Sequence, residues 1–279
     1  MSIITLTTDY GLKDHFVGAL KGKILSNFAD ATIIDISHDV DPFNTVEASY
    51  IINAAFSSFP NGTVHIIGVD SELNKENQHI VMFWKKHYFI CADNGILGSL
   101  TQKFLPEKLF AINIHDRLSN EASDLDVFVT VACHIATGGA LNVIGREISE
   151  IKSLTELQPA VTPNSINGFI IYVDSVGNLV TNISKTLFLE VAQGRPYEID
   201  VNELRVTNSK KIKSIWPKYS DIGTDGTFPL KSYEGQKLAI FNEAGLLEIA
   251  VFRSNPKRVG SASTLLGLKY RDAITINFL

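Results

Sequence analysis

The chain has 279 residues, of which 45% are hydrophobic and 20% charged, so it can bury the core of one large or two medium domains. Its formal net charge of −5 argues against a general nucleic-acid-binding protein, which is usually basic. Cys91 and Cys133 lie in hydrophobic surroundings typical of reduced core residues, and no basic leader or bilayer-length hydrophobic run is present, so we expect a cytoplasmic protein without membrane association.

The first half of the chain alternates strand and helix patterns. A β-branched apolar run over residues 3–6 leads to Thr8-Asp9-Tyr10-Gly11, and apolar residues recur at helical spacing from about Asp14. Further strands are expected over residues 32–36, 63–69, 79–84, 87–92 and 109–114, with 79–84 and 87–92 forming a hairpin around Lys85-Lys86. Helices are expected over 44–59, where Asn44 and Glu47 have the spacing of a capping box, and over 127–137. This alternation predicts an α/β domain over residues 1–157, a mainly parallel sheet sandwiched between helices.

Asp9 stands just past the first predicted strand. In open α/β sheets, ligands bind in the crevice outside the carboxyl ends of the strands. A carboxylate there offers strong acceptors to a sugar diol, and Gly11 allows the backbone to turn tightly beside it. The alternative is that Asp9 only forms the turn or caps the next helix.

A group of polar residues follows the second predicted strand: Asp35, His38, Asp39 and Asp41. Such a group could hold a metal ion, but we interpret these residues as loop and turn formers and expect no metal site. Neither a dinucleotide-binding glycine fingerprint nor a nucleophile elbow occurs in the chain.

The second half of the chain has a different pattern. Residues 154–167 contain Pro159 and Pro163 without a clear period, which favours a domain boundary. Short strands are expected beyond it, over residues 169–173, 198–206, 236–242, 247–252 and 273–278. They predict a second domain over residues 165–279 that is all-β, with a barrel-like or sandwich form.

The segment from Asp174 to Asn178 opens this second domain. An Asn side chain donates and accepts hydrogen bonds at once, which suits the edge of a purine. The alternative is a hairpin in which Asn178 merely follows Gly177 in a turn.

Six motifs occur in the order in which one enzyme family carries them. They are Thr8-Asp9-Tyr10-Gly11 with Asp14, Asp35-Ile36-Ser37-His38 with Pro42 and Glu47, Phe59-Pro60-Asn61-Gly62-Thr63-Val64-His65, Asp93-Asn94-Gly95-Ile96-Leu97, Asp174 with Gly177-Asn178-Leu179-Val180-Thr181-Asn182-Ile183, and Gly260-Ser261-Ala262 with Leu266-Gly267-Leu268. The chain thus resembles, nearly end to end, the S-adenosyl-L-methionine (SAM) hydroxide adenosyltransferases, which are related to the fluorinase and chlorinase. The main length difference is an apparent insertion at residues 255–259.

The resemblance implies a homotrimer whose adenosyl sites lie between the first domain of one subunit and the second domain of its neighbour. SAM would be the substrate, with no cofactor, and water would attack C5′ of the ribose to give adenosine and L-methionine. Asp9 would bind the ribose hydroxyls, Asn178 would bind the adenine edge and Tyr219 would lie on the adenine ring. Asp14 and Asp174 would lie near the methionine end.

The chain departs from the family pattern at the reaction centre. Hydrolases of the family carry an Asp, an Arg and a His around the attacking water; Asp70 matches the first, but Asn77 and Ser123 replace the other two. We expect Asp124 to act as the general base, alone or with Asp70, because two carboxylates without the intervening cation repel each other and favour proton uptake. The alternative is that Asp124 points to solvent and caps a helix starting near Asp126.

The methionine end differs as well, because Glu243 stands where related sequences often have Ser. Three functions therefore stay open: hydrolysis of SAM or a related 5′-substituted adenosine, non-catalytic binding of adenosyl compounds, and a structural trimer with a vestigial pocket. Halogenation is not expected, since the added carboxylates would repel a halide ion.

Overall fold

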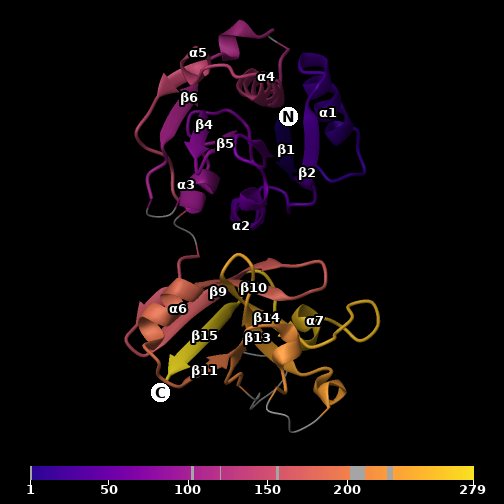
Figure 1. Ribbon diagram of the computed structural model, residues 1–279, viewed down its shortest axis with the longest axis vertical. Coiled ribbons are helices and arrows are strands. Elements are labelled where there is room, and N and C mark those ends of the chain that lie inside the picture. The colour runs from indigo at the N-terminus through magenta and orange to yellow at the C-terminus, as the bar shows by residue number, and fades with distance from the viewer. Residues whose placement is uncertain (1, 102–103, 120, 155–156, 202–210, 225–228) are drawn as a thin grey trace. The chain divides into compact units, whose positions relative to one another are not determined.

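The computed structural model describes residues 2–101, 104–119, 121–154, 157–201, 211–224 and 229–279. The chain divides into two compact units, Met1–Leu154 and Thr155–Leu279. Each unit has its own sheet and its own hydrophobic core (Figure 1). Among the described residues, no helix is both long and apolar enough to cross a membrane.

The first unit contains a seven-stranded sheet with the order β2-β1-β3-β5-β4-β6-β7. Its strands are β1 (Ile3–Thr8), β2 (Thr32–Ser37), β3 (Val64–Gly68), β4 (His79–Trp84), β5 (His87–Ala92), β6 (Lys108–Ile112) and β7 (Gly145–Glu147). β1, β2, β3 and β5 pair in parallel, whereas β4 forms an antiparallel hairpin with β5. Lys85 and Lys86 make the hairpin turn with φ of 48° and 64°, so the expected hairpin is confirmed.

Helices cover both faces of this sheet, as the sequence pattern predicts. One core joins α1 (Phe16–Asn27) and α4 (Asp124–Ala136) to the sheet, and a second joins α2 (Thr45–Ala55) and α3 (Ile96–Thr101) to its other face. A short helix, α5 (Leu141–Ile144), precedes β7. The Asn44 side chain accepts a hydrogen bond from the Glu47 N–H and caps α2, which confirms the capping pattern. The α/β sandwich is therefore confirmed.

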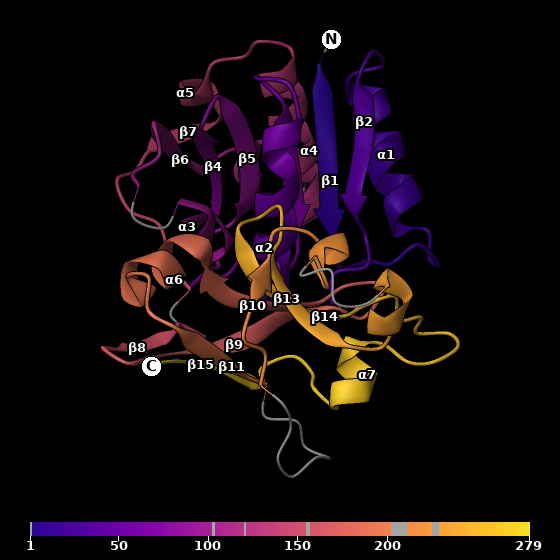
Figure 2. The ribbon, with the colours of Figure 1, turned by 60° about the horizontal axis from the view of Figure 1, so that its bottom comes forward.

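β1 lies between β2 and β3 and is parallel to both (Figure 2 shows β1 beside β2). The chain leaves β1 toward β2 on one side and reaches β3 on the other, so the strand order reverses next to β1. Gly68 ends β3, and a Cβ added there would lie 3.3 Å from the Leu125 side chain and 3.6 Å from the Tyr10 hydroxyl. The missing side chain thus allows the start of α4 to approach the ends of β1 and β3.

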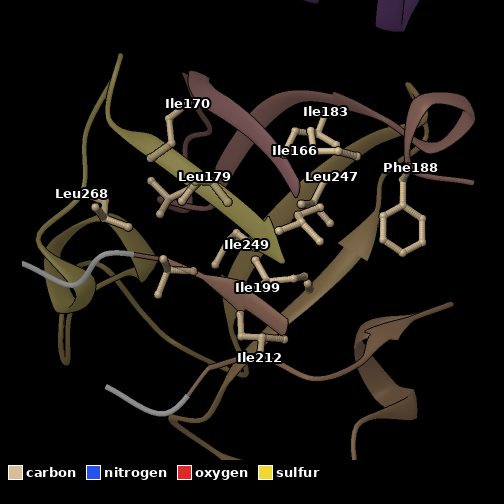
Figure 3. Packing of buried hydrophobic residues seen from close by; sticks show 14 of the residues in the cluster. Ile166, Ile170, Leu179, Ile183, Phe188, Ile199, Ile212, Leu247, Ile249 and Leu268 are labelled. Carbon is tan, nitrogen blue, oxygen red and sulfur yellow. The ribbon is translucent and has the colours of Figure 1, made fainter. Parts of the chain in front are cut away.

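The second unit contains an eight-stranded sheet that curls into a half-barrel, with the order β11-β15-β9-β10-β14-β13-β12 and β8 paired to β9. Its strands are β8 (Ala160–Thr162), β9 (Ser165–Val173), β10 (Leu179–Ser184), β11 (Tyr197–Asp200), β12 (Ile215–Trp216), β13 (Lys237–Phe241), β14 (Leu246–Val251) and β15 (Ala273–Phe278). Figure 3 shows isoleucines and leucines, most of them from these strands, packed together with Phe188 at the edge of the group.

The sequence-based prediction was wrong for parts of this unit. It is not purely β, because it also contains α6 (Lys185–Ala192) and α7 (Ala262–Leu266). Ser184 and Ser261 cap these helices through their side chains, and both helices are too short to show a hydrophobic period. Residues 158–167 hold β8 and the start of β9, and of the strand expected over 198–206 the described part is β11, while 202–210 lie outside the described residues.

A buried histidine, His65, lies on β3 inside an aromatic cluster. Its Nδ1 is 2.7 Å from the Thr5 hydroxyl oxygen and its Nε2 is 3.2 Å from Nδ1 of His87. The Phe89 ring stacks on it, with centroids 4.9 Å apart. Burial, followed by the charge of His87, lowers the pKa of His65 from 6.5 to about 3, so the folded protein holds this imidazole neutral.

This histidine should make the protein sensitive to acid. The unfolded chain takes up a proton at His65 near pH 6.5, whereas the folded chain resists protonation down to about 3. The free energy of unfolding should therefore fall below pH 6.5, by about 1.4 kcal/mol per pH unit from this residue. Urea unfolding between pH 7 and pH 5 measures this slope. His65→Phe should flatten it, the exposed control His15→Phe should not, and equal slopes in all three proteins would contradict the assignment.

Candidate active site

The Asp9 carboxylate lies on the loop that follows β1. Its Oδ2 accepts a hydrogen bond from the Phe43 N–H at 3.0 Å. Gly11, with φ of 65°, donates its N–H to the His38 carbonyl at 2.7 Å, which ties the loops after β1 and β2 together. The carboxylate is thereby fixed in orientation, and an ionised carboxylate can accept further hydrogen bonds from a diol.

Asp70 follows β3 and adopts a left-handed backbone conformation with φ of 45°. This conformation is uncommon for a residue other than glycine. The Asn94 side-chain amide holds it by donating to the Val69 and Asp70 carbonyls, both at 3.0 Å. Backbone strain of this kind concentrates at functional sites, which supports the choice of Asp70.

Asp124 is the first residue of α4, which begins three residues before the helix expected over 127–137. Ser123, not Asp124, is the cap: its hydroxyl oxygen accepts from the Asp126 N–H at 3.4 Å, and the Asp126 carboxylate accepts from the Ser123 N–H at 2.8 Å. The Asp124 Oδ2 accepts instead from the Leu73 N–H at 2.9 Å. The carboxylate therefore binds the loop that follows Asp70, and the alternative in which Asp124 caps the helix is wrong.

Tyr10 joins these groups. Burial raises the pKa of its hydroxyl, a hydrogen bond with the Ser71 side chain lowers it, and the negative charges of Asp9 and Asp124 raise it further. The Tyr10 hydroxyl thus contacts Ser71, the residue after Asp70, and is close enough to Asp9 and Asp124 to be affected by their charges. Sequence reasoning did not select Tyr10, although it stands inside the motif that drew attention to Asp9.

The far end of the same loop binds a lysine. The Lys152 ammonium donates to the Asn77 Oδ1 at 2.9 Å and to the Glu76 carbonyl, and the Lys152 backbone N–H donates to Oδ1 of Asp93 at 2.9 Å. A cation therefore contacts the position where the family resemblance places an arginine. Sequence reasoning missed this residue because it lies 75 positions along the chain.

In the second unit, Asp174 organises the turn between β9 and β10. Its Oδ1 accepts from the N–H groups of Val176 at 3.0 Å and Asn178 at 2.8 Å, and its Oδ2 accepts from the Asn178 side-chain amide at 2.9 Å. The same amide lies 3.4 Å from the Tyr219 hydroxyl. The hairpin interpretation of this segment is thus observed, and it places Asn178 beside Tyr219, a residue that is 39% exposed.

Glu248 on β14 completes this polar cluster. The Tyr219 hydroxyl donates to its Oε1, and the Asn242 side-chain amide donates to its Oε2 at 3.3 Å. Burial raises the pKa of Glu248, the hydrogen bonds from Tyr219 and Asn242 lower it, and the charge of Asp174 raises it. Sequence reasoning missed Glu248, although one charge within the apolar run 246–252 was the available signal.

The other candidate residues have different surroundings. Asp14 is exposed on the loop before α1. Asp35 lies on β2, where it pairs with the Lys21 ammonium at 2.6 Å. Over the described ranges, no three His, Cys, Asp or Glu side chains are grouped to hold a metal ion.

Comparisons with known proteins give a consistent result. Residues 4–145 match the SAM hydroxide adenosyltransferase N-terminal domain and residues 168–275 match the C-terminal domain. An (R)-S-adenosyl-L-methionine hydrolase from Methanocaldococcus jannaschii is 30% identical, covering 99% of this chain and 96% of that protein. A fluorinase from Actinopolyspora mzabensis is 24% identical over 66% of this chain and 72% of its own length.

A solved structure extends the likeness to three dimensions. The crystal structure of an uncharacterized conserved protein from Thermotoga maritima has a TM-score of 0.78 and 29% identity, with 99% of this chain and 100% of that chain covered.

The contact between Asp124 and the loop can be measured directly. Asp124→Ala should speed hydrogen exchange of the Leu73 amide by roughly tenfold or more, since hydrogen bonds to charged groups contribute about 1.5–3 kcal/mol. Asp124→Asn keeps an acceptor oxygen and should show a smaller effect. Hydrogen–deuterium exchange with mass spectrometry over residues 71–78 is the measurement, with the exposed Glu121→Ala as the matched control. Unchanged exchange in Asp124→Ala would show that this bond does not hold the loop.

Proposed function

The chain belongs to the SAM hydroxide adenosyltransferase family, and we propose that it hydrolyses SAM to adenosine and L-methionine. The similarity to a named SAM hydrolase over nearly the whole of both chains supports this proposal. In this proposal SAM is the substrate and no cofactor takes part. We also propose a cytoplasmic location, in keeping with the unpaired, buried Cys91 and Cys133.

The observation that carries the proposal is that three aspartates lie near the point where the strand order reverses. Asp9 follows β1, Asp70 follows β3, and Asp124 begins α4. Tyr10 contacts Ser71 and lies within the electric field of Asp9 and Asp124. Ligands of open α/β sheets bind at such a reversal, outside the carboxyl ends of the strands. Carboxylates there attract the positive sulfonium of SAM and can accept a proton from water.

The reaction needs little covalent help from the protein. A bond forms between the water oxygen and C5′ while the C5′–S bond breaks, and the electron pair leaves with sulfur as the neutral thioether of methionine. The water proton passes to Asp124, or to Asp70 when the two share the role. Asp9 holds the ribose hydroxyls, so the main work of the protein is to orient C5′ and the water.

Lys152 supports a working reaction centre despite the missing family arginine. Its ammonium contacts Asn77, the position at which the family has that arginine. A cation at this position replaces the positive charge that Asn77 lacks. The charge is thus supplied from the segment before the second unit rather than from the loop itself.

A second candidate function is non-catalytic binding of an adenosyl compound. It is favoured by Ser123, whose hydroxyl donates to Oδ2 of Asp126 and cannot replace an imidazole base. Asp9, Asn178 and Tyr219 would suffice for binding. Adenosine binding by calorimetry, without release of adenosine from SAM, would select this function over hydrolysis.

Asp124→Asn tests the proposed chemistry. The change keeps the shape of the side chain but removes its basicity, so turnover of SAM should fall on the order of 10²–10⁴-fold while adenosine affinity is retained. Adenosine release measured by chromatography gives the rate. Asp70→Asn shows whether the role is shared, and the exposed Glu121→Gln serves as control. Full turnover in both aspartate variants would refute the assignment, and a wild type without activity would favour the binding protein.

We further propose a homotrimer in which each site combines one subunit's first unit with its neighbour's second. Asp9→Ala and Asn178→Ala subunits should each be inactive. Mixed in equal amounts they should recover about a quarter of the sites, because each site then draws both intact halves at random. Activity after subunit exchange, together with the mass from light scattering, gives the answer. A monomeric mass at micromolar concentration would rule this assembly out.

A further inference from the structure

Behind Asp124 lies a pair of histidines that the proposed chemistry leaves unused. His79 opens β4 and is buried, and its Nε2 lies 2.9 Å from the Ser71 carbonyl oxygen and 4.0 Å from Oδ1 of Asp124. Its Nδ1 lies 3.1 Å from Nε2 of His115. The Phe128 ring packs edge-on against the His79 imidazole, with centroids 4.6 Å apart.

These contacts fix where the protons lie. A carbonyl oxygen only accepts hydrogen bonds, so Nε2 of His79 carries the proton that it donates to Ser71. Nδ1 of His79 is then the acceptor, and Nε2 of His115 donates to it. Burial lowers the pKa of His79 and keeps the ring neutral, although its bond to Ser71 and the charge of Asp124 raise it and His115 lowers it. The chain of bonds therefore runs from His115 through His79 and presents an N–H on the side of Asp124.

We infer that His79 and His115 are positioning residues for the hydrolysis, and that they act through Asp124. This inference rests on the proposed function. His79 holds the loop at Ser71, two residues before the Leu73 N–H that binds one oxygen of Asp124. Its Nε2 lies 4.0 Å from the other oxygen, beyond hydrogen-bond distance, so the N–H that binds Ser71 acts on this oxygen only as a nearby dipole. The Leu73 donor and this dipole thus both depend on His79, and His115 fixes the tautomer that lets His79 donate to Ser71.

Other charged groups also surround Asp124, so the stabilisation that depends on His79 matters for its charged form. Tyr10 approaches from the loop after β1, with the negative Asp9 beside it. On α4 itself, Asp126 pairs with the Lys23 ammonium at 2.6 Å. Without His79, the loop that carries the Leu73 N–H would lose its bond at Ser71, and the charged carboxylate would face these groups with less stabilisation. An imidazole from β4 thus serves the reaction centre, although the family position for histidine holds Ser123.

Two substitutions at His79 distinguish the effect of its N–H donor from the effect of the volume of its ring. Gln places an N–H₂ near the position of Nε2 and keeps the bond to Ser71, whereas Leu removes it. His79→Leu should lower kcat roughly 10- to 100-fold, leave KM nearly unchanged, and move the acid limb of the pH–rate profile upward by about one pH unit. His79→Gln should restore most of the rate and the original limb, and His115→Leu should fall between the two.

The matched control is His134→Leu at the other end of α4, where Nε2 of His134 likewise lies 3.0 Å from a carbonyl oxygen, that of Ala140. It should leave the pH profile in place. An unmoved acid limb in His79→Leu, or equal rates in the Gln and Leu variants, would overturn the inference.

A readout that does not depend on activity distinguishes this inference from the proposed function. Nitrogen-15 NMR of the imidazoles should show His79 protonated at Nε2, and the titration of the Asp124 carboxyl carbon, identified with Asp124→Asn, should move upward in His79→Leu. Both hold even for a wild type that releases no adenosine, which would defeat the proposed function alone. His79 protonated at Nδ1 would overturn the inference, as would an unmoved Asp124 titration in folded His79→Leu. If His79→Leu does not fold, the tautomer of His79 in wild type and in His115→Leu decides.

Discussion

The parallel pairing of β1 with both β2 and β3 is the constraint on which the candidate site depends. It brings the loops after β1 and β3 to the same edge of the sheet, and α4 begins close to that edge because Gly68 has no side chain. Asp9, Asp70 and Asp124 are far apart in sequence but share one region for this reason. A larger residue at position 68 would push against Leu125 and Thr8, which lie 3.3 and 3.4 Å from its Cβ position.

Electrostatics explains why so many acids are tolerated there. Two carboxylates 4 Å apart repel by about 4 kcal/mol at an effective dielectric constant near 20, whereas one hydrogen bond to a charged group contributes about 1.5–3 kcal/mol. Two or three donors can therefore offset one such repulsion. The donors are the N–H groups of Phe43 and Leu73, and the Lys152 ammonium lies at the far end of the loop. The remaining negative potential would suit a cationic substrate such as the proposed SAM.

Local patterns were enough to predict the α/β class, the β4–β5 hairpin and the cap at Asn44, because each depends on neighbours within a few residues. Asp9 could also be selected from the sequence, since it follows a recognisable strand. The partners of the site were not. Lys152 reaches Asn77 across 75 positions and His115 reaches His79 across 36, and periodicity carries no information on such contacts. The helices α6 and α7 were missed for a different reason, since eight and five residues are too few to show a helical period.

The sequence alone indicates that the family arginine and histidine are missing, whereas the structure shows a lysine beside the arginine position and a histidine near Asp124. A reaction centre requires a donor, an acceptor or a charge at a point in space, not a residue type at a position in the chain. Lys152 contacts Asn77 and the His79 imidazole lies 4.0 Å from Asp124, while Ser123 is a helix cap. Substituting the family residues back one at a time would not recreate the family site, because Asn77 is bonded to Lys152 and Ser123 is bonded to Asp126. In the proposed site, residues that hold the loop would therefore also set the charge that the substrate meets.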